Sequence, residues 1–298
     1  MVMLNIYDES LGLLEMGCDP YVVASLTVGS PSIRENKRNR ALGDGEYDDT
    51  MFTGARAITA ALRLKTNGIN CEPSQSMQTL LDQLTPYMSP RIRPTLTWQL
   101  PGSTAIRAAT VRGHNWPYTM QAPKHLPLTV QFRVPSGEIL GGLDDGTIRS
   151  ICETIRPAQD TEDGRTYDLI FDREYPPSAP IGSRSVNNPG NAPSNWELTI
   201  YGPVEAPTFT VNGTEIRTDN PLTGPLTILA GQHLTINTRN RTVLFNSLPN
   251  DSRYSYLNYY QWGWDDLLLR PGQNTVRYDG SNLGIQSSSV LCWTPAFL

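Results

Sequence analysis

The chain has 298 residues, of which 38% are hydrophobic and 18% charged, and it contains 24 glycines and 24 prolines. This length exceeds what one hydrophobic core usually serves, so we expect two domains, built from short strands and turns because glycine and proline are frequent. A net charge of −5 lacks the basic excess of a nucleic-acid-binding surface, and neither a signal peptide nor an apolar run long enough to span a membrane is evident.

The first half of the chain predicts several strands. Between Ala57 and Leu64, one set of alternate residues, Ile58, Ala60, Leu62 and Leu64, is apolar, and the other is small or polar, which is the period of a strand with one buried face. Other apolar runs are bounded by turn residues such as "PGS" and "GHNWP". The further strands are expected at residues 21–29, 95–100, 105–113 and 127–134.

One helix is expected after Pro73. Ser74 or Ser76 can cap its start, and Pro86 and Pro90 end it. Its apolar residues recur at helical spacing, so one stripe should pack against a sheet. The stripe consists of Met77, Leu80, Leu81, Leu84, Tyr87 and Met88.

A polar, acidic segment at residues 155–166 separates two sets of strand patterns. We place the domain boundary there, which gives domains at 1–158 and 159–298. Beyond it, short apolar runs alternate with turns, as in a β-sandwich or jelly roll, and Asn237 to Arg241 is the expected tip of a hairpin.

The sequence contains few of the residues and motifs that are typical of catalytic or metal-binding sites. Its four cysteines, at positions 18, 71, 152 and 292, form no C-x-x-C pair, so we expect reduced, mostly buried thiols and no zinc site. No G-x-S-x-G, H-E-x-x-H or G-x-x-x-x-G-K-[ST] motif is present. We therefore predict a protein that is not an enzyme and holds no cofactor and no metal.

Two tryptophans beside two acids could form a sugar site. Trp262 and Trp264 precede Asp265 and Asp266 in "WGWDDLLLRPG". Adjacent residues of a strand point to opposite faces, so the acids make a poor catalytic pair. Sugar contact through the tryptophans competes with the simpler interpretation, a buried tryptophan cluster.

The segment "RNRALGDGEYDD" places basic residues before acidic ones. A calcium loop counted from Asp44 fails, because Asp49 stands where glycine is required and Ala55 stands where the last glutamate is required. A cation site of another geometry on Asp44, Glu46 and Asp48 is an alternative. The acids cancel the nearby basic charge, which disfavours a DNA contact. The charged residues are Arg38, Arg40, Asp44, Glu46, Asp48 and Asp49.

We interpret this segment as a protruding hairpin with a basic ascending arm and an acidic descending arm. Opposed charges on one arm suit a head-to-tail ring, in which each subunit presents a different surface to each neighbour. A solvent-exposed hairpin with ion pairs inside one chain fits the same pattern, so both interpretations stand at this point.

The chain resembles the distal tail protein family, also called minor tail proteins, of long-tailed bacteriophages. The resemblance covers nearly the whole chain. It is carried by "IRENKRNRALGDGEYDDTMFTGARAITAALRL" (33–64), "RPTLTWQLPGS" (93–103), "DTEDGRTYDLIFDREYPPSAPIGS" (160–183), "NPGNAPSNWELTIYGPVEAPTFTVNG" (188–213) and "WGWDDLLLRPGQNTVRYDG" (262–280).

The resemblance implies a mainly β protein. Its first domain would be a tail-tube-like β-sandwich or split barrel with one flanking helix, and its second a galectin-like, jelly-roll sandwich. The first domain would form a homo-hexameric ring, with 38–54 as the hairpin between subunits.

By the same resemblance, the protein is a structural component of the virion at the tail tip or baseplate, made in the host cytoplasm. The ring would join the tail tube protein to the tail-tip hub protein and other minor tail proteins. DNA would pass along its axial channel as cargo, and no part would enter a membrane. A carbohydrate-binding module for host adsorption is the alternative role.

Overall fold

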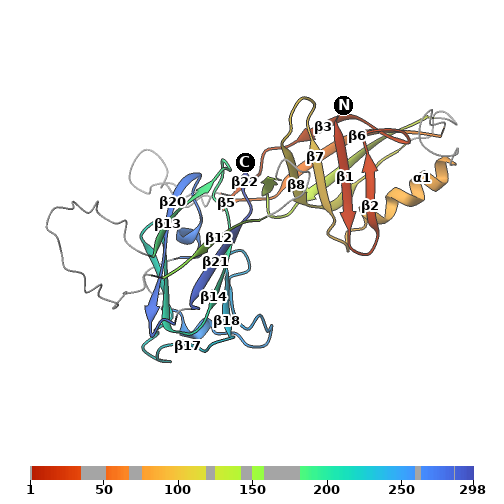
Figure 1. Ribbon diagram of the computed structural model, residues 1–298. Helices are drawn as coiled ribbons and strands as arrows, with labels where there is room; N and C mark the ends of the chain where they lie inside the picture. The colour runs from red at the N-terminus through yellow and green to blue at the C-terminus, as the bar shows by residue number, and fades with distance from the viewer. Residues whose placement is uncertain are drawn as a thin grey trace, which may run out of the picture. The chain divides into compact units, whose positions relative to one another are not determined.

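The computed structural model describes residues 2–34, 52–66, 76–118, 125–141, 150–157, 182–258, 263–284 and 286–298. The chain divides into two compact units, Met1–Arg149 with Phe297–Leu298, and Ser150–Ala296. Strands dominate both units (Figure 1), which confirms the predicted mainly β class.

One sheet of the first unit has six strands and includes the end of the chain. Neighbouring strands run antiparallel wherever their register is defined. In order across the sheet, the strands are β2 (Gly12–Met16), β1 (Met3–Asp8), β7 (Thr95–Gln99), β8 (Ile106–Thr110), β11 (Ile139–Gly141) and β22 (Ala296–Phe297).

The second sheet of this unit has four antiparallel strands. They are β3 (Tyr21–Val28), β6 (Arg56–Lys65), β10 (His125–Val134) and β9 (Arg112–Asn115). The alternation predicted for 57–64 is confirmed, because Ile58, Leu62 and Leu64 are buried while Ala57 and Arg63 are exposed. Period-2 burial therefore gives β6 one core face and one outward face.

The predicted strand at 105–113 is two strands in two different sheets. β8 and β9 meet at Val111, which is fully buried and donates its backbone N–H to the Pro94 carbonyl at 2.9 Å. Just beyond, a side chain on Gly113 would lie 2.2 Å from the Met88 carbonyl oxygen. The chain crosses between sheets here because glycine allows this close approach.

The predicted helix is present as α1 (Met77–Leu84), followed by the 3-10 turn η1 (Thr85–Met88). Ser76 caps it, since its hydroxyl oxygen accepts from the Thr79 N–H at 3.2 Å. The predicted apolar stripe is buried and joins the core formed by the inner faces of both sheets. Burial of this stripe, rather than helix propensity, stabilises so short a helix.

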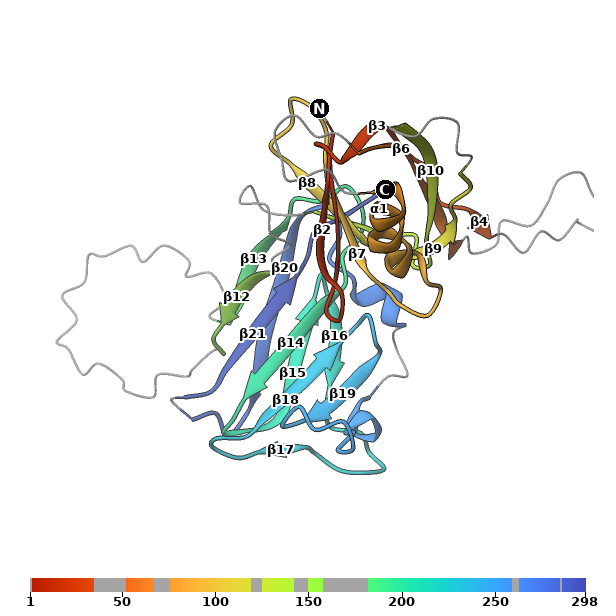
Figure 2. The ribbon, with the colours of Figure 1, turned by 90° about the vertical axis from the view of Figure 1, so that its right-hand side faces the viewer.

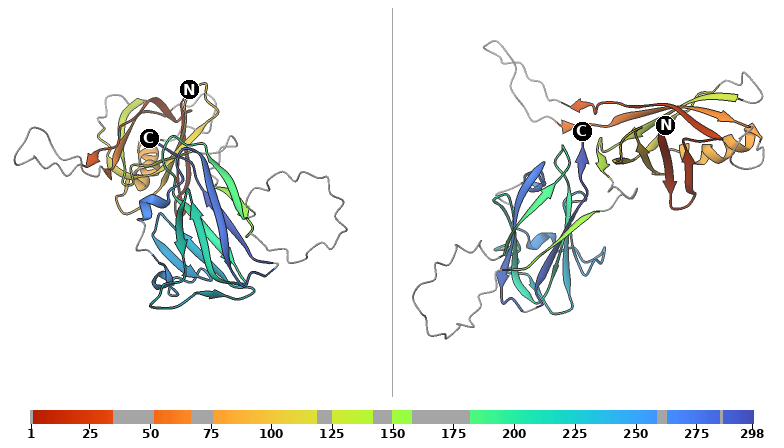
Figure 3. Two further views of the ribbon diagram at one scale, coloured as in Figure 1. Left: turned by 90° about the vertical axis from the view of Figure 1, so that its left-hand side faces the viewer. Right: turned by 45° about the horizontal axis from the view of Figure 1, so that its top comes forward.

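The second unit is a sandwich of two five-stranded sheets, which face each other in Figures 2 and 3. Trp196 from one sheet and Phe209 from the other pack with ring centroids 5.7 Å apart inside a separate core. The first sheet runs β12 (Ile151–Ile155), β21 (Ser288–Trp293), β14 (Trp196–Tyr201), β18 (His233–Asn237), β19 (Thr242–Phe245). The second runs β13 (Ser183–Asn188), β20 (Gly272–Ser281), β15 (Val204–Val211), β16 (Thr214–Arg217), and β17 (Thr227–Ile228) also pairs with β15.

The predicted hairpin tip at Asn237 to Arg241 is confirmed. β18 and β19 pair antiparallel up to Asn237 opposite Thr242, and Arg241 has the positive φ of 55° that a tight turn requires. The Asn237 side chain accepts the Asn240 N–H at 2.9 Å, which holds the turn.

The start of the second unit lies earlier than the sequence indicated. We assigned residues 150–158 to the first domain, but β12 pairs along its whole length with β21, so Ile151–Ile155 belongs to the second unit. The polar segment that suggested the boundary follows this strand, and residues 158–181 lie outside the described part of the chain.

The expectation of reduced, mostly buried cysteines is wrong for Cys152 and Cys292. Cys152 and Cys292 stand directly opposite each other on β12 and β21, with Cα atoms 4.1 Å apart, and form a disulfide. Cys18 is a free thiol but is exposed. Cys71 lies outside the described residues. A separation of 140 residues hid the bonded pair, because cysteine spacing reveals only local pairs.

Candidate assembly interface

The predicted inter-subunit hairpin starts and ends on a short antiparallel ladder. β4 (Ile33–Arg34) pairs with β5 (Phe52–Thr53), with Ile33 opposite Thr53. The six charged residues between them, from Arg38 to Asp49, lie outside the described residues. Their role at an interface therefore stays a prediction.

The chain that leads from this ladder into β6 is held tightly by backbone contacts. Ala55 accepts the Ser32 N–H at 3.0 Å, and Ala57 accepts the Gly29 N–H at 2.8 Å. A side chain on Gly54 would lie 2.2 Å from the Ser32 hydroxyl oxygen. These contacts fix the backbone on both sides of residue 56.

Arg56, the first residue of β6, has a buried guanidinium. Only 4% of the residue is exposed, and it sits opposite Val134 in the sheet. Its Nε and Nη2 atoms have no hydrogen-bond partner. Burial lowers the pKa of this guanidinium from its ordinary value. Arg56 was not predicted as a site residue, although the period of two places it on the same face as the buried Ile58.

The outward face of the four-stranded sheet is basic. None of its four strands contains Asp or Glu. Arg133 on β10 stands opposite Arg112 on β9, and Arg63 is exposed on β6. Lys65 pairs with Asp19 at 3.1 Å. Like charges placed opposite each other on a sheet are unfavourable, so this face suits an anionic neighbour.

The outward face of the six-stranded sheet carries exposed apolar side chains at its β1–β2 edge, with Asn5 and the exposed Glu15 between them. Tyr7 stands opposite Leu13, and Met3 lies on the same face two rows away. These side chains are 48%, 55% and 57% exposed, respectively. Exposed apolar side chains that neighbour one another on a sheet edge are a candidate protein-contact surface.

In the second unit, Trp264 has a structural role. Its ring is half-buried against the second core and lies 6.0 Å from the Tyr254 ring, and its Nε1–H donates to the Tyr254 hydroxyl at 3.2 Å. Trp262 lies outside the described residues. The described tryptophan is therefore part of a packed aromatic pair, and sugar contact through the two residues stays a prediction.

We had assumed that Asp265 and Asp266, the two acids beside Trp264, lie on a strand, but they do not. They lie in the 3-10 turn η3 (Trp264–Leu267). The Asp266 carboxylate accepts the Gly263 N–H at 2.7 Å and caps this turn, while Asp265 lies 3.7 Å from Arg241. The pair is explained by turn capping and a surface ion pair.

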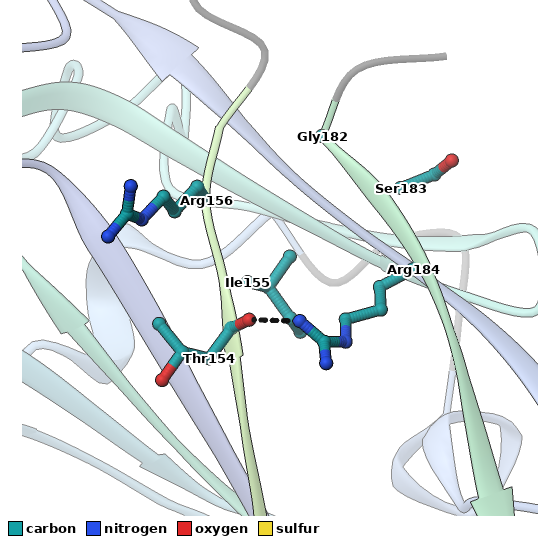
Figure 4. Close-up of a pocket in the computed structure, with 6 residues that line it drawn as sticks. All are labelled: Thr154, Ile155, Arg156, Gly182, Ser183 and Arg184. Atoms are coloured by element: carbon teal, nitrogen blue, oxygen red, sulfur yellow. Dashed lines mark hydrogen bonds between the residues drawn. The ribbon is translucent and has the colours of Figure 1, made fainter. Parts of the chain in front are cut away.

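A shallow pocket opens where β12 and β13 lie side by side (Figure 4). Arg184 crosses it to donate to the Thr154 carbonyl at 3.2 Å, and it also pairs with Glu153 at 2.8 Å. Arg156 points away from Arg184 in this view. Because Arg184 is already neutralised and Arg156 diverges from it, the two do not form an anion site.

Metal-ligand clusters and membrane-spanning helices are absent from the described residues. These residues contain no group of three or more His, Cys, Asp or Glu side chains that could hold a metal ion. Within the same part of the chain, no helix is long and apolar enough to cross a membrane. The outward sheet faces and the buried Arg56 are thus the features that point to function.

The chain was compared with known families, curated proteins and solved structures. No family profile and no curated protein matches it. The crystal structure of the SPP1 Dit protein, described as a paradigm of the hub adsorption apparatus in phages that infect Gram-positive bacteria, aligns with a TM-score of 0.61 at 13% identity and covers 99% of both chains. The protein has the Dit fold.

A second solved structure, the phage p2 baseplate in its activated conformation with strontium, aligns with a TM-score of 0.47 at 10% identity over 98% of each chain. That score is too low to carry an argument. The SPP1 Dit alignment agrees with the predicted fold, two β-rich units with one helix in the first, and spans both of them.

Proposed function

We propose that this protein is a distal tail protein of a long-tailed bacteriophage, a structural part of the tail tip and not an enzyme. The fold likeness to SPP1 Dit over 99% of both chains carries this proposal, because it includes both units. The resemblance of the sequence blocks to that family supports it independently.

In this proposal the first unit forms a hexameric ring that joins the tail tube to the tip hub, with other minor tail proteins around it. Each subunit of such a ring offers two different surfaces to its neighbours. The exposed apolar side chains of the β1–β2 edge, Met3, Tyr7 and Leu13, are our candidate for one of these surfaces.

The ring leaves an axial channel through which DNA passes as cargo. We assign the basic outward face of β3, β6, β10 and β9 to the channel wall, because Arg63, Arg112 and Arg133 carry positive charge there without a carboxylate on these strands. Six copies would repeat this charge around a polyanion.

A carbohydrate-binding role of the second unit is the competing function. The packing of Trp264 against Tyr254 disfavours it, since a stacked and hydrogen-bonded ring is not free to form a platform for a sugar. A glycan array with the full-length protein tests this role directly. Specific glycan binding that survives in high salt would favour it over a purely structural protein.

The ring itself is tested with the purified chain. We expect six-fold rings in electron micrographs and a hexamer in native mass spectrometry, with the population of hexamer rising with protein concentration. A chain that stays monomeric at about 100 µM, a concentration well above the Kd of a typical stable interface, would contradict assembly through the first unit alone.

A further inference from the structure

The first strand of the second unit is held unevenly along its length. β12 forms one edge of its sheet, beside β21 (Figure 2). At the end of β12, Ile155 is only 2% exposed, and its carbonyl accepts the hydroxyl of the buried Ser289 at 3.2 Å. At the start, Ile151 is only partly buried and Cys152 is exposed. An edge strand with little burial is free to open locally, so the start of β12 is its weaker end.

The side-chain contacts at this weaker end lie at the surface. Glu153 pairs with Arg184 at 2.8 Å, but the two side chains are 35% and 52% exposed. The Ser150 and Thr294 hydroxyls lie 3.2 Å apart in an exposed hydrogen bond. Such contacts stabilise a fold only slightly, because water competes for the same groups. Apart from the backbone ladder with β21, the disulfide is therefore the main restraint on the start of β12.

The disulfide is also accessible to solvent. Cys152 is exposed on β12, and Cys292 is half-buried opposite it on β21. Thiol–disulfide exchange begins when a thiolate attacks one sulfur of the bond, so exposed disulfides are the labile ones. A small thiol can therefore reach this bond while the sheet is folded.

We propose that the Cys152–Cys292 disulfide is a redox switch, which frees the start of β12 when a small thiol reduces it and leaves the rest of the second unit folded. In the first step, the thiolate of one small thiol attacks one sulfur, forms a mixed disulfide and displaces the other cysteine as a thiolate. A second small thiol then attacks the mixed disulfide and releases the second cysteine. The two cysteines gain two electrons and two protons, and the two small thiols become one small disulfide.

The switch would respond to the compartment of the protein. The chain is expected to be made in a host cytoplasm, where small thiols keep accessible cysteines reduced, and a small disulfide outside the cell would close the bond by the reverse steps. The chain enters the second unit at Ser150, just before Cys152, and leaves it at Ala296, shortly after Cys292. The closed bond thus joins the entry and exit segments of this unit, and the open bond leaves the entry segment free. The inference does not depend on the ring.

Hydrogen exchange measured by mass spectrometry on the full chain tests the switch. The samples are the oxidised wild type, the wild type in a large excess of reduced glutathione, and the double variant Cys152→Ser/Cys292→Ser. Exchange in the peptide that covers β12 is compared with exchange in the peptide from β14, which lies inside the same sheet. Cys18→Ser is the matched control, because it removes an exposed thiol and keeps the disulfide.

We expect the amides of β12 to exchange at least about ten times faster in both samples that lack the bond, while those of β14 stay protected, because local opening requires less free energy than global unfolding. Oxidised glutathione should restore the protection of β12 in the wild type and not in the double variant. Cys18→Ser should match the wild type in every solution.

Three results would overturn the switch. If thiol titration shows that the bond stays closed in excess reduced glutathione, it is a permanent link. If the bond opens and β12 exchanges no faster, the strand does not depend on it. If β14 loses protection as much as β12, reduction unfolds the whole unit and not its first strand. None of these results depends on ring assembly, so they leave the proposed function to its own test.

Discussion

The disulfide between Cys152 and Cys292 should set much of the stability of the second unit. The two residues are separated by 140 positions, so the bond closes a loop that includes nearly the whole unit. In the chain-entropy model, closing a loop of this length raises the free energy of the unfolded chain by about 5 kcal/mol at 25 °C. For a unit of this size, that corresponds to a drop of about 10 °C or more in its unfolding temperature when the bond is removed.

The assay is differential scanning calorimetry of the wild type, with and without a dithiol reductant, and of the double variant Cys152→Ser/Cys292→Ser. Reduced wild type and the double variant should unfold together, at least about 10 °C below the oxidised protein. Cys18→Ser is the control and should leave the midpoint unchanged, since Cys18 is an exposed free thiol. Titration of four thiols in denatured, unreduced protein would refute the bond, as would identical midpoints with and without reductant.

Gly113→Ala should lower the free energy of unfolding, measured in urea, by more than about 3 kcal/mol, because the added methyl meets the backbone of Met88 at 2.2 Å. A loss below about 1 kcal/mol would show that the crossing between sheets is looser than described. Trp264→Ala should lower the free energy of unfolding by about 2 kcal/mol, because the aromatic pair with Tyr254 is lost, and should leave glycan-array signals unchanged. Loss of a glycan signal at unchanged stability would instead assign this tryptophan to sugar contact. Burial first, and the nearby Tyr87 second, raise the pKa of Tyr21 to about 12, so its ionisation favours the unfolded chain, and stability should fall between about pH 10 and pH 12. Tyr21→Phe should remove that part of the pH dependence in alkaline melts, and an unchanged slope would exclude Tyr21 as its source.

Local patterns predicted local structure well. The strand β6 follows from its period of two, and helix α1 follows from its apolar stripe and the Ser76 cap, because both signals come from neighbouring residues. The hairpin after Asn237 follows from turn chemistry. These elements needed no knowledge of the rest of the chain.

The failures involve contacts between distant residues. The break at Val111 depends on the approach of Gly113 to Met88, and the disulfide depends on the register of β12 against β21. The return of Phe297 to the six-stranded sheet is likewise a pairing with a strand more than 150 residues earlier. Sequence spacing carries no such information, so these features required the structure.

The candidate site was predictable only in part. Charge patterning directed attention to the segment from Arg38 to Asp49, which lies outside the described residues, and gave no sign of the buried arginine at position 56. In the sequence, an arginine at the start of an alternating strand is interpreted as the polar end of that strand. Pattern analysis uses residue types and contains no information about hydrogen-bond partners. Only the three-dimensional arrangement reveals that its Nε and Nη2 atoms are buried without a hydrogen-bond partner.

We propose that this chain forms a ring at the junction of tail tube and tail tip. Cryo-electron microscopy of the tail tip of the virion that carries it tests this most directly. We predict six copies around the tail axis, with the first unit forming the ring and the face of β3, β6, β10 and β9 toward the channel. Density for this chain elsewhere in the virion, or as single copies without six-fold order at that junction, would contradict the claim.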